Sequence, residues 1–88
     1  MGYSVKYSAE AYKSLRKIDR FQAKIIIAWV EKNLIGCDNP RIYGKPLTAN
    51  LKGLWRYRIG AYRIIADIQD NIVTIEIVDA GHRQEIYR

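Results

Sequence analysis

The stretch Leu54–Tyr87, LWRYRIGAYRIIADIQDNIVTIEIVDAGHRQEIY, decides the fold of this 88-residue chain. Apolar and polar residues alternate in three short segments of it, which predicts three consecutive strands. Gly60-Ala61 suits a two-residue type II′ turn, and Asp70-Asn71 suits a two-residue type I′ turn. The stretch therefore predicts a three-stranded antiparallel meander, followed by a short basic and aromatic tail.

The two turns fix an expected register. The first turn pairs Arg58 with Arg63, while the second pairs Gln69 with Ile72 and Arg63 with Val78. Side chains of a strand alternate between its two faces, so this register gives one apolar face for the core and one charged face. The charged face collects Arg56, Arg58, Arg63, Asp67 and Glu76. We expect this face to be open, because the predicted helices cover the other one.

The first half of the chain supplies those helices. Alternation over residues 3–7 predicts a short strand, and Ser8 then caps a helix from Ala9 to Ile18. Asp19 caps a second helix that ends near Asn33, with an apolar stripe expected to include Phe21, Ile25, Ala28 and Trp29. The Pro- and Gly-containing stretch 36–53 is expected to be a basic loop.

The expected fold class is α+β. An N-terminal strand and a two-helix hairpin pack on an antiparallel sheet of about four strands, in a single domain over residues 1–88. The run Ile25-Ile26-Ile27 offers more apolar surface than one stripe needs. Either the core is larger than usual, or a partner chain covers the surplus.

The composition favours a negatively charged partner. Fifteen Lys and Arg against nine Asp and Glu give a net charge of +6, which suits nucleic acid or an acidic protein, although a basic soluble protein without such a partner is the plain alternative. No apolar run reaches the ~18 residues of a membrane span, and the first residues do not form a secretory signal, so we expect a cytoplasmic protein. The single cysteine excludes a disulfide framework, and we expect no metal and no cofactor.

The expected pairing of Arg58 with Arg63 is the strongest functional signal. Like charges directly opposite each other destabilise a sheet, whereas a phosphate bound between them would turn repulsion into a clamp. Alternatively, Glu76 and Asp67 neutralise the pair in a surface ion network. Because Arg56 and Arg83 add further positive charge, anion binding is the favoured interpretation.

His82 and Tyr87, which both follow the last predicted strand, could transfer protons. His82 follows a glycine, and histidine changes its charge near neutral pH, which suits a general acid or base. Tyr87 could stack on a base or donate its phenolic proton. The alternative for both residues is a purely structural role.

The segments WRYRIGAYRIIADI and GHRQEIYR together resemble the RelE toxins of bacterial toxin–antitoxin pairs, within the RelE/ParE superfamily. The resemblance implies a microbial-RNase-like fold, ribosome-dependent cleavage of mRNA as an endoribonuclease, and a RelB-like antitoxin in a heterotetramer or larger complex. The implied catalytic and RNA-binding residues are Arg56, Arg58, Arg63, His82, Arg83 and Tyr87. The basic loop adds Lys45 and Lys52 as expected RNA contacts.

The implied reaction is attack of an RNA 2′-OH on the adjacent phosphate, with arginines stabilising the transition state without a metal. The base stays open. This chain has Arg56 and Arg58 where the best-known pattern has lysines, and arginine does not give up its proton, so His82 and Glu76 are the candidates. The alternative function is that of a ParE-like inhibitor of DNA gyrase with the same fold and no nuclease activity.

Overall fold

The computed structural model describes residues 2–82 and confirms the α+β class. Its strands form one sheet in the order β1-β5-β4-β3-β2, so this part of the chain holds a five-stranded sheet rather than one of about four strands. β1 is parallel to β5, and all other neighbours are antiparallel. The elements are β1 (Ser4–Tyr7), α1 (Ala9–Lys17), α2 (Arg20–Asn33), η1 (Pro40–Tyr43), β2 (Lys45–Pro46), η2 (Ala49–Leu51), β3 (Trp55–Ile59), β4 (Tyr62–Gln69), η3 (Asp70–Ile72) and β5 (Thr74–His82).

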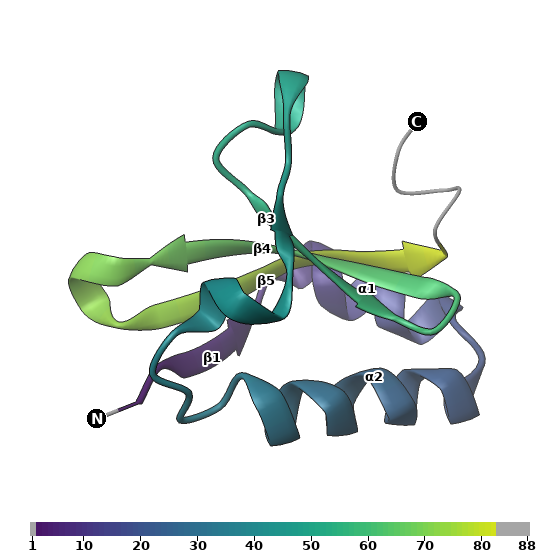
Figure 1. Cartoon of the computed structure of the whole chain (residues 1–88). Helices are drawn as coiled ribbons and strands as arrows, with labels where there is room; N and C mark the ends of the chain where they lie inside the picture. The colour runs from purple at the N-terminus through teal and green to yellow at the C-terminus, as the bar shows by residue number, and fades with distance from the viewer. Residues whose placement is uncertain (1, 83–88) are drawn as a thin grey trace.

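Both helices begin at the predicted caps and lie on one side of the sheet (Figure 1). The Ser8 hydroxyl accepts a hydrogen bond from the Ala11 N–H at 3.0 Å. The Asp19 carboxylate accepts from the N–H groups of Phe21 and Gln22 at 3.1 and 3.3 Å. These bonds satisfy N–H groups that the first turn of a helix leaves without partners.

The buried stripe of α2 differs from the predicted one. Ile26 and Val30 are buried, whereas Phe21 is exposed and Ile25 is 41% exposed. Trp29 of the predicted stripe does pack against the core, but Ile26 and Val30, four residues apart, take the buried positions expected for Phe21 and Ile25. Three consecutive isoleucines allow either choice, and only the packing against the sheet decides between them.

One hydrophobic cluster joins the helices to the sheet. Its largest fully buried side chains include Tyr57 of β3, Ile26 of α2 and Ile75 of β5. The Tyr57 hydroxyl donates a hydrogen bond to the backbone carbonyl of Pro40 at 2.8 Å, which ties η1 to the core. Burial raises the pKa of the Tyr57 phenol, so this hydroxyl stays protonated as a donor.

The expected loop 36–53 contains regular structure. η1 is followed by β2, which pairs Lys45 with Arg56 and Pro46 with Trp55. The Leu47 N–H then donates to the Leu54 carbonyl at 3.0 Å. The resulting hairpin extension rises from the sheet on the side opposite the helices (Figure 1).

The first predicted turn is confirmed, and the second is wrong. Arg58 pairs with Arg63, and Gly60 has φ +62°, as the first position of a type II′ turn requires. The second connection is a four-residue turn through η3 with Val73 at φ +50°, so Gln69 pairs with Thr74 and not with Ile72. Non-local contacts of the turn, described below, hold this conformation.

A β-bulge in β5 changes the register again. Ala66 pairs with Ile77, but Ile65 pairs with Asp79, so Val78 is an extra residue. Arg63 consequently lies opposite Gly81 and not opposite Val78 as predicted. The extra residue also reverses the alternation toward the end of β5, so that Ala80 joins the core on the helix side and His82 pairs with Tyr62 on that side.

No helix in residues 2–82 combines the length and the apolar character needed to cross a bilayer.

Candidate active site

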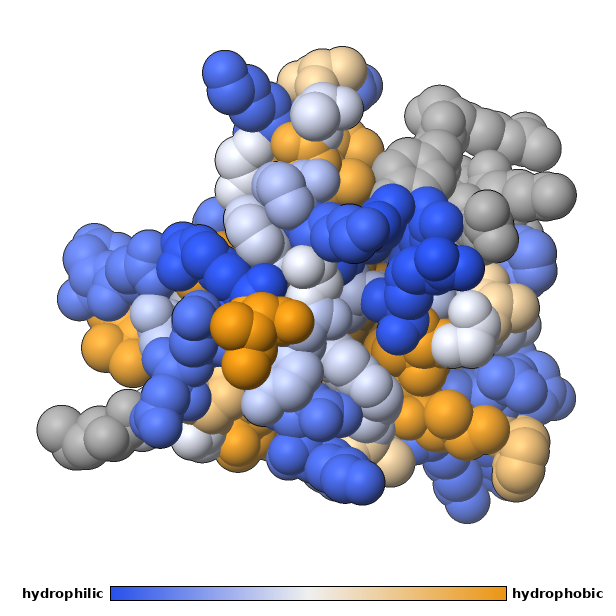
Figure 2. All heavy atoms as spheres, viewed as in Figure 1, coloured by the Kyte–Doolittle hydropathy of each residue, from blue (hydrophilic) through white to orange (hydrophobic). Residues whose placement is uncertain are grey.

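Four basic side chains gather on the sheet face away from the helices. We call Lys45, Arg56, Arg58 and Arg63 the arginine face. Lys45 of β2 pairs with Arg56 of β3, and Arg58 pairs with Arg63 of β4, so directly opposed side chains point to the same side. In Figure 2, hydrophilic side chains accordingly gather over β3, seen from the same side as in Figure 1. The first turn predicted the pairing of Arg58 with Arg63, whereas the pairing of Lys45 with Arg56 was not predicted.

Arg63 is not exposed, although the face was predicted to be open. Only 7% of Arg63 and 3% of its neighbour Ile65 is accessible to solvent, whereas Arg58 is exposed. The prediction counted only helices as possible covers of the sheet. A guanidinium in such a position keeps its positive charge and has little freedom to move. The pair therefore combines a largely buried cation, Arg63, with an exposed one, Arg58.

Glu76 lies at the other end of this face. It pairs with Asp67, four residues from Arg63 along β4, which is about 13 Å at the usual rise of a strand. The amide of Gln69 donates to Asp67 at 3.0 Å and to Glu76 at 3.3 Å. Proton transfer needs contact at hydrogen-bond distance, so Glu76 is poorly placed as a base for a phosphate held by the arginine pair.

His82 lies on the helix side of the sheet. It pairs with Tyr62, and the two rings make an edge-to-face contact with their centroids 5.5 Å apart. Both residues line a hollow of about 350 Å³, together with side chains of α1 and the α1–α2 connection; its polar members are Ser14, Lys17, Asp19 and Asp79. The Ser14 hydroxyl donates to Asp79 at 2.6 Å. The structure thus separates His82 from the arginine face.

The remaining predicted site residues are scattered or not described. Lys52 is exposed at the end of the hairpin extension, where it follows η2. Arg83 and Tyr87 lie outside the described residues, so their expected roles stay predictions. Among residues 2–82, no group of three or more His, Cys, Asp or Glu side chains is placed to hold a metal ion.

A surface pocket beside the arginine face contains residues that the sequence analysis missed. The pocket measures about 240 Å³ and is lined by Ile42, Tyr43, Gly44, Lys45, Arg56 and Arg58. The signal was present as two large apolar residues directly before Gly44 in a basic loop. It was not recognised because the loop was not expected to have a defined structure.

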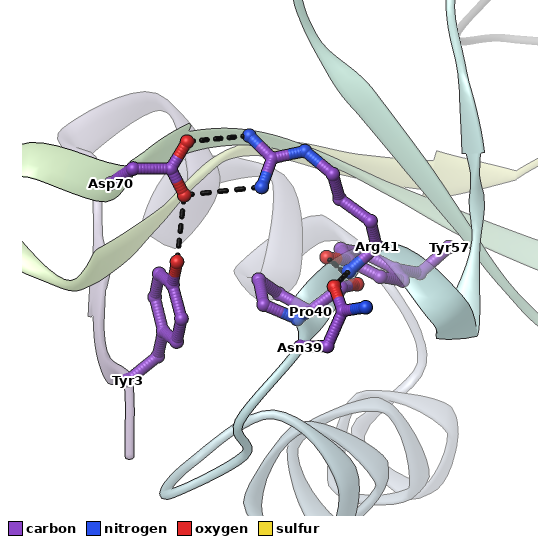
Figure 3. A network of polar contacts seen from close by, with 6 residues as sticks. All are labelled: Tyr3, Asn39, Pro40, Arg41, Tyr57 and Asp70. Carbon is purple, nitrogen blue, oxygen red and sulfur yellow. Dashed lines mark hydrogen bonds and ion pairs between the residues drawn. The ribbon is translucent and has the colours of Figure 1, made fainter. Parts of the chain in front are cut away.

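An ion pair fixes the position of η1 (Figure 3). The Arg41 guanidinium binds both carboxylate oxygens of Asp70, at 3.1 and 2.8 Å, and the Tyr3 hydroxyl donates to the same carboxylate at 2.6 Å. Hydrogen bonds from Arg41 and Tyr3 lower the pKa of Asp70 to about 2. The carboxylate therefore links η1 and the residue before β1 to the β4–β5 turn.

Comparison with known proteins agrees with this fold. A family model described as the ParE toxin of the type II toxin–antitoxin system parDE matches residues 5–87. Toxin RelG of Mycobacterium tuberculosis is 34% identical over 89 residues, which cover 100% of this chain and 99% of RelG. Toxin RelE of the same organism is 33% identical over 86 residues, covering 98% of this chain and 87% of that toxin.

Solved structures give the same result. The toxin–antitoxin complex RelBE2 of Mycobacterium tuberculosis contains a chain that superimposes with a TM-score of 0.80 at 25% identity, covering 94% of this chain and 100% of that one. A mutant of the Escherichia coli toxin RelE in the free state has a TM-score of 0.75 at 18% identity, covering 97% and 87%, and so supports the fold alone. The family match over nearly the whole chain, together with these relatives, shows that the chain belongs to the RelE/ParE superfamily of type II toxin–antitoxin toxins.

Proposed function

We propose that this toxin is a ribosome-dependent mRNA endonuclease that arrests translation. One observation carries the proposal: Arg58 and Arg63 lie directly opposite each other on a face that also presents Arg56 and Lys45. Like charges in this register repel each other, and a phosphate bound between them would attract both. Arginine suits a phosphate because its planar fork donates two parallel hydrogen bonds.

The proposed reaction is attack of a 2′-OH on the neighbouring phosphorus. The bond from phosphorus to the 5′-oxygen of the next nucleotide breaks, leaving a 2′,3′-cyclic phosphate and a free 5′-OH. Arg58 and Arg63 would stabilise the extra negative charge of the five-coordinate phosphorus, which needs no metal. Of the two candidate bases in the described chain, neither Glu76 nor His82 lies beside the arginine pair. Either other groups transfer the protons, or Glu76 or His82 does so after a rearrangement on the ribosome.

Substitution of Arg58 tests the proposal. Arg58 is exposed, so Arg58→Ala should fold normally and cut mRNA on the ribosome more slowly by on the order of 100-fold. Arg20→Ala is the matched control, because Arg20 is exposed at the start of α2 on the other side of the sheet. Mapping of new mRNA 5′ ends gives the readout. Equal cleavage by Arg58→Ala and wild type would show that the arginine pair does not act on the phosphate.

The proposed partner is an antitoxin of the RelB type, besides the ribosome and mRNA. A groove of about 420 Å³ between α1 and α2 could receive an apolar segment of it; the groove is lined by Tyr7, Tyr12, Leu15, Arg16, Ala23 and Ile27. The RelBE2 complex of Mycobacterium tuberculosis is a precedent for such a pair. Ile27→Glu should weaken co-purification with the antitoxin, whereas Ile72→Glu, on the exposed β4–β5 turn, should not. Equal recovery with both variants would place the antitoxin elsewhere.

A second candidate function is inhibition of DNA gyrase without cleavage of nucleic acid. The match to the ParE toxin model favours it, as does the separation of His82 from the arginine face. Intact mRNA together with DNA damage after induction would support this candidate. New mRNA ends with undamaged DNA would support the endonuclease.

A further inference from the structure

We infer that the pocket beside the arginine face is a nucleotide subsite in which Tyr43 stacks on an RNA base while the neighbouring cations hold its phosphate. This inference rests on the proposed endonuclease function and adds a binding residue to it. The pocket joins two unlike surfaces, because Ile42 and Tyr43 form one wall and Lys45, Arg56 and Arg58 form the other. A nucleotide has the same division into an apolar ring and an anionic phosphate.

The apolar wall is exposed to solvent. Ile42 is 69% and Tyr43 41% exposed, whereas Pro40, at the start of the same η1, is buried and accepts the hydrogen bond from Tyr57. Figure 2 shows an apolar patch over η1, bordered by hydrophilic side chains. A phenol ring next to cations is the usual platform for bases of single-stranded RNA, since every base has a face that can stack.

The ring of Tyr43 is held in place by its neighbours. It meets Trp29 edge to face with centroids 6.4 Å apart, and Trp29 in turn packs on Tyr57 at 5.6 Å. A ring that is already oriented loses little freedom when a base binds. Tyr43 therefore stands at the exposed end of an aromatic row that begins in the core.

Gly44 sets the distance between the two walls. A Cβ atom at this position would lie 2.1 Å from the backbone oxygen of Arg56 and 2.8 Å from a ring carbon of Tyr57. Only glycine lets η1 approach β3 so closely. The same contact brings Tyr43 beside Arg56 and Arg58, which are two residues apart on β3 and thus about 7 Å from each other.

The test measures binding of a short RNA analogue that cannot be cut because its 2′ positions are methylated. Fluorescence anisotropy compares it with the same backbone carrying abasic sites. Tyr43→Leu should bind the base-containing oligonucleotide about 10-fold more weakly than wild type, in line with the loss of one stacking contact. Tyr43→Phe should bind within about 2-fold of wild type, because it keeps the ring. Phe21→Leu, which shortens an exposed aromatic side chain of α2, is the matched control.

The abasic oligonucleotide separates stacking from a general structural effect. Wild type and Tyr43→Leu should bind it equally, since no base is left to stack. Equal binding of the base-containing oligonucleotide by wild type and Tyr43→Leu overturns the subsite, as does a loss that is the same with and without bases. The subsite is also overturned if wild type binds neither oligonucleotide and Tyr43→Leu weakens only the antitoxin complex. That result would assign the pocket to the protein partner.

The outcome is independent of cleavage. Base-dependent binding through Tyr43 in a toxin that leaves mRNA intact would refute the proposed endonuclease and keep the subsite. If Tyr43→Leu changed neither codon-phased cleavage nor oligonucleotide binding, the subsite would be refuted and the endonuclease proposal would be kept.

Discussion

The hydrogen bond from Tyr57 to Pro40 connects the core to the candidate site, and its removal has a calculable effect. Tyr57→Phe deletes one hydroxyl and keeps the ring that packs on Trp29. A hydrogen bond contributes about 1 kcal/mol net, and a buried carbonyl left without its donor raises the loss toward about 2 kcal/mol. For a domain of this size each kcal/mol shifts the melting temperature by roughly 4–8 °C. We therefore expect Tyr57→Phe to melt at a temperature lower by roughly 5–15 °C.

Thermal unfolding followed by circular dichroism measures this shift. Tyr12→Phe is the matched control, because its hydroxyl lies on an exposed side chain of α1 and should contribute nothing measurable. A wild-type melting temperature in Tyr57→Phe would refute the reasoning, since it would mean that Pro40 finds another donor without cost. The same variant should also bind the methylated oligonucleotide more weakly, because η1 carries Tyr43 and loses its anchor to β3.

Three further outcomes follow from contacts elsewhere in the fold. The pKa of Asp70 is lowered to about 2 from an unfolded value near 3.9. Its ion pair with Arg41 therefore stabilises the protein above about pH 4, and this stabilisation is lost as the pH falls through 2. In urea unfolding, the difference in stability between wild type and Asp70→Asn should shrink between pH 5 and pH 2. Ile26→Ala should reduce the free energy of unfolding by about 2–5 kcal/mol, whereas Ile25→Ala should reduce it by less than about 1 kcal/mol; equal losses would restore the predicted stripe. Arg58→Gln should lower the slope of log affinity against log salt for single-stranded RNA by about 0.7, and an unchanged slope would mean that Arg58 contacts no phosphate.

Local patterns were sufficient to predict most of the fold. Ser8 and Asp19 were recognised as helix caps because a cap depends only on its own hydrogen bonds to the next few residues. The Gly60-Ala61 turn was predicted correctly for the same reason, and with it the pairing of Arg58 and Arg63. The predicted pairing of Arg58 with Arg63 thus depended only on the two residues of the Gly60-Ala61 turn.

The errors arose where distant residues decide the local conformation. The four-residue β4–β5 turn carries Asp70, which bonds to Tyr3 and Arg41, 67 and 29 positions away in the sequence. The burial of Arg63 could not be predicted from helices alone. Tyr43 was missed because its contact with Trp29 depends on the tertiary packing of Gly44 against β3. Patterns of adjacent residues carry no information about such long-range contacts.

The bulge at Val78 has a consequence for the chemistry of the arginine face. Without the extra residue, the alternation along β5 would place His82 on the same face as Arg63; with it, His82 packs against Tyr62 on the helix side. His82 is the only histidine of the chain, so the arginine face has no imidazole. If this face acts on phosphate, its contribution is electrostatic, through charges that do not titrate near neutral pH. No rotamer of His82 can carry its ring through the sheet to the arginine face. If the pH dependence of cleavage showed the titration of a histidine, β5 would have to rearrange so that His82 reached that face.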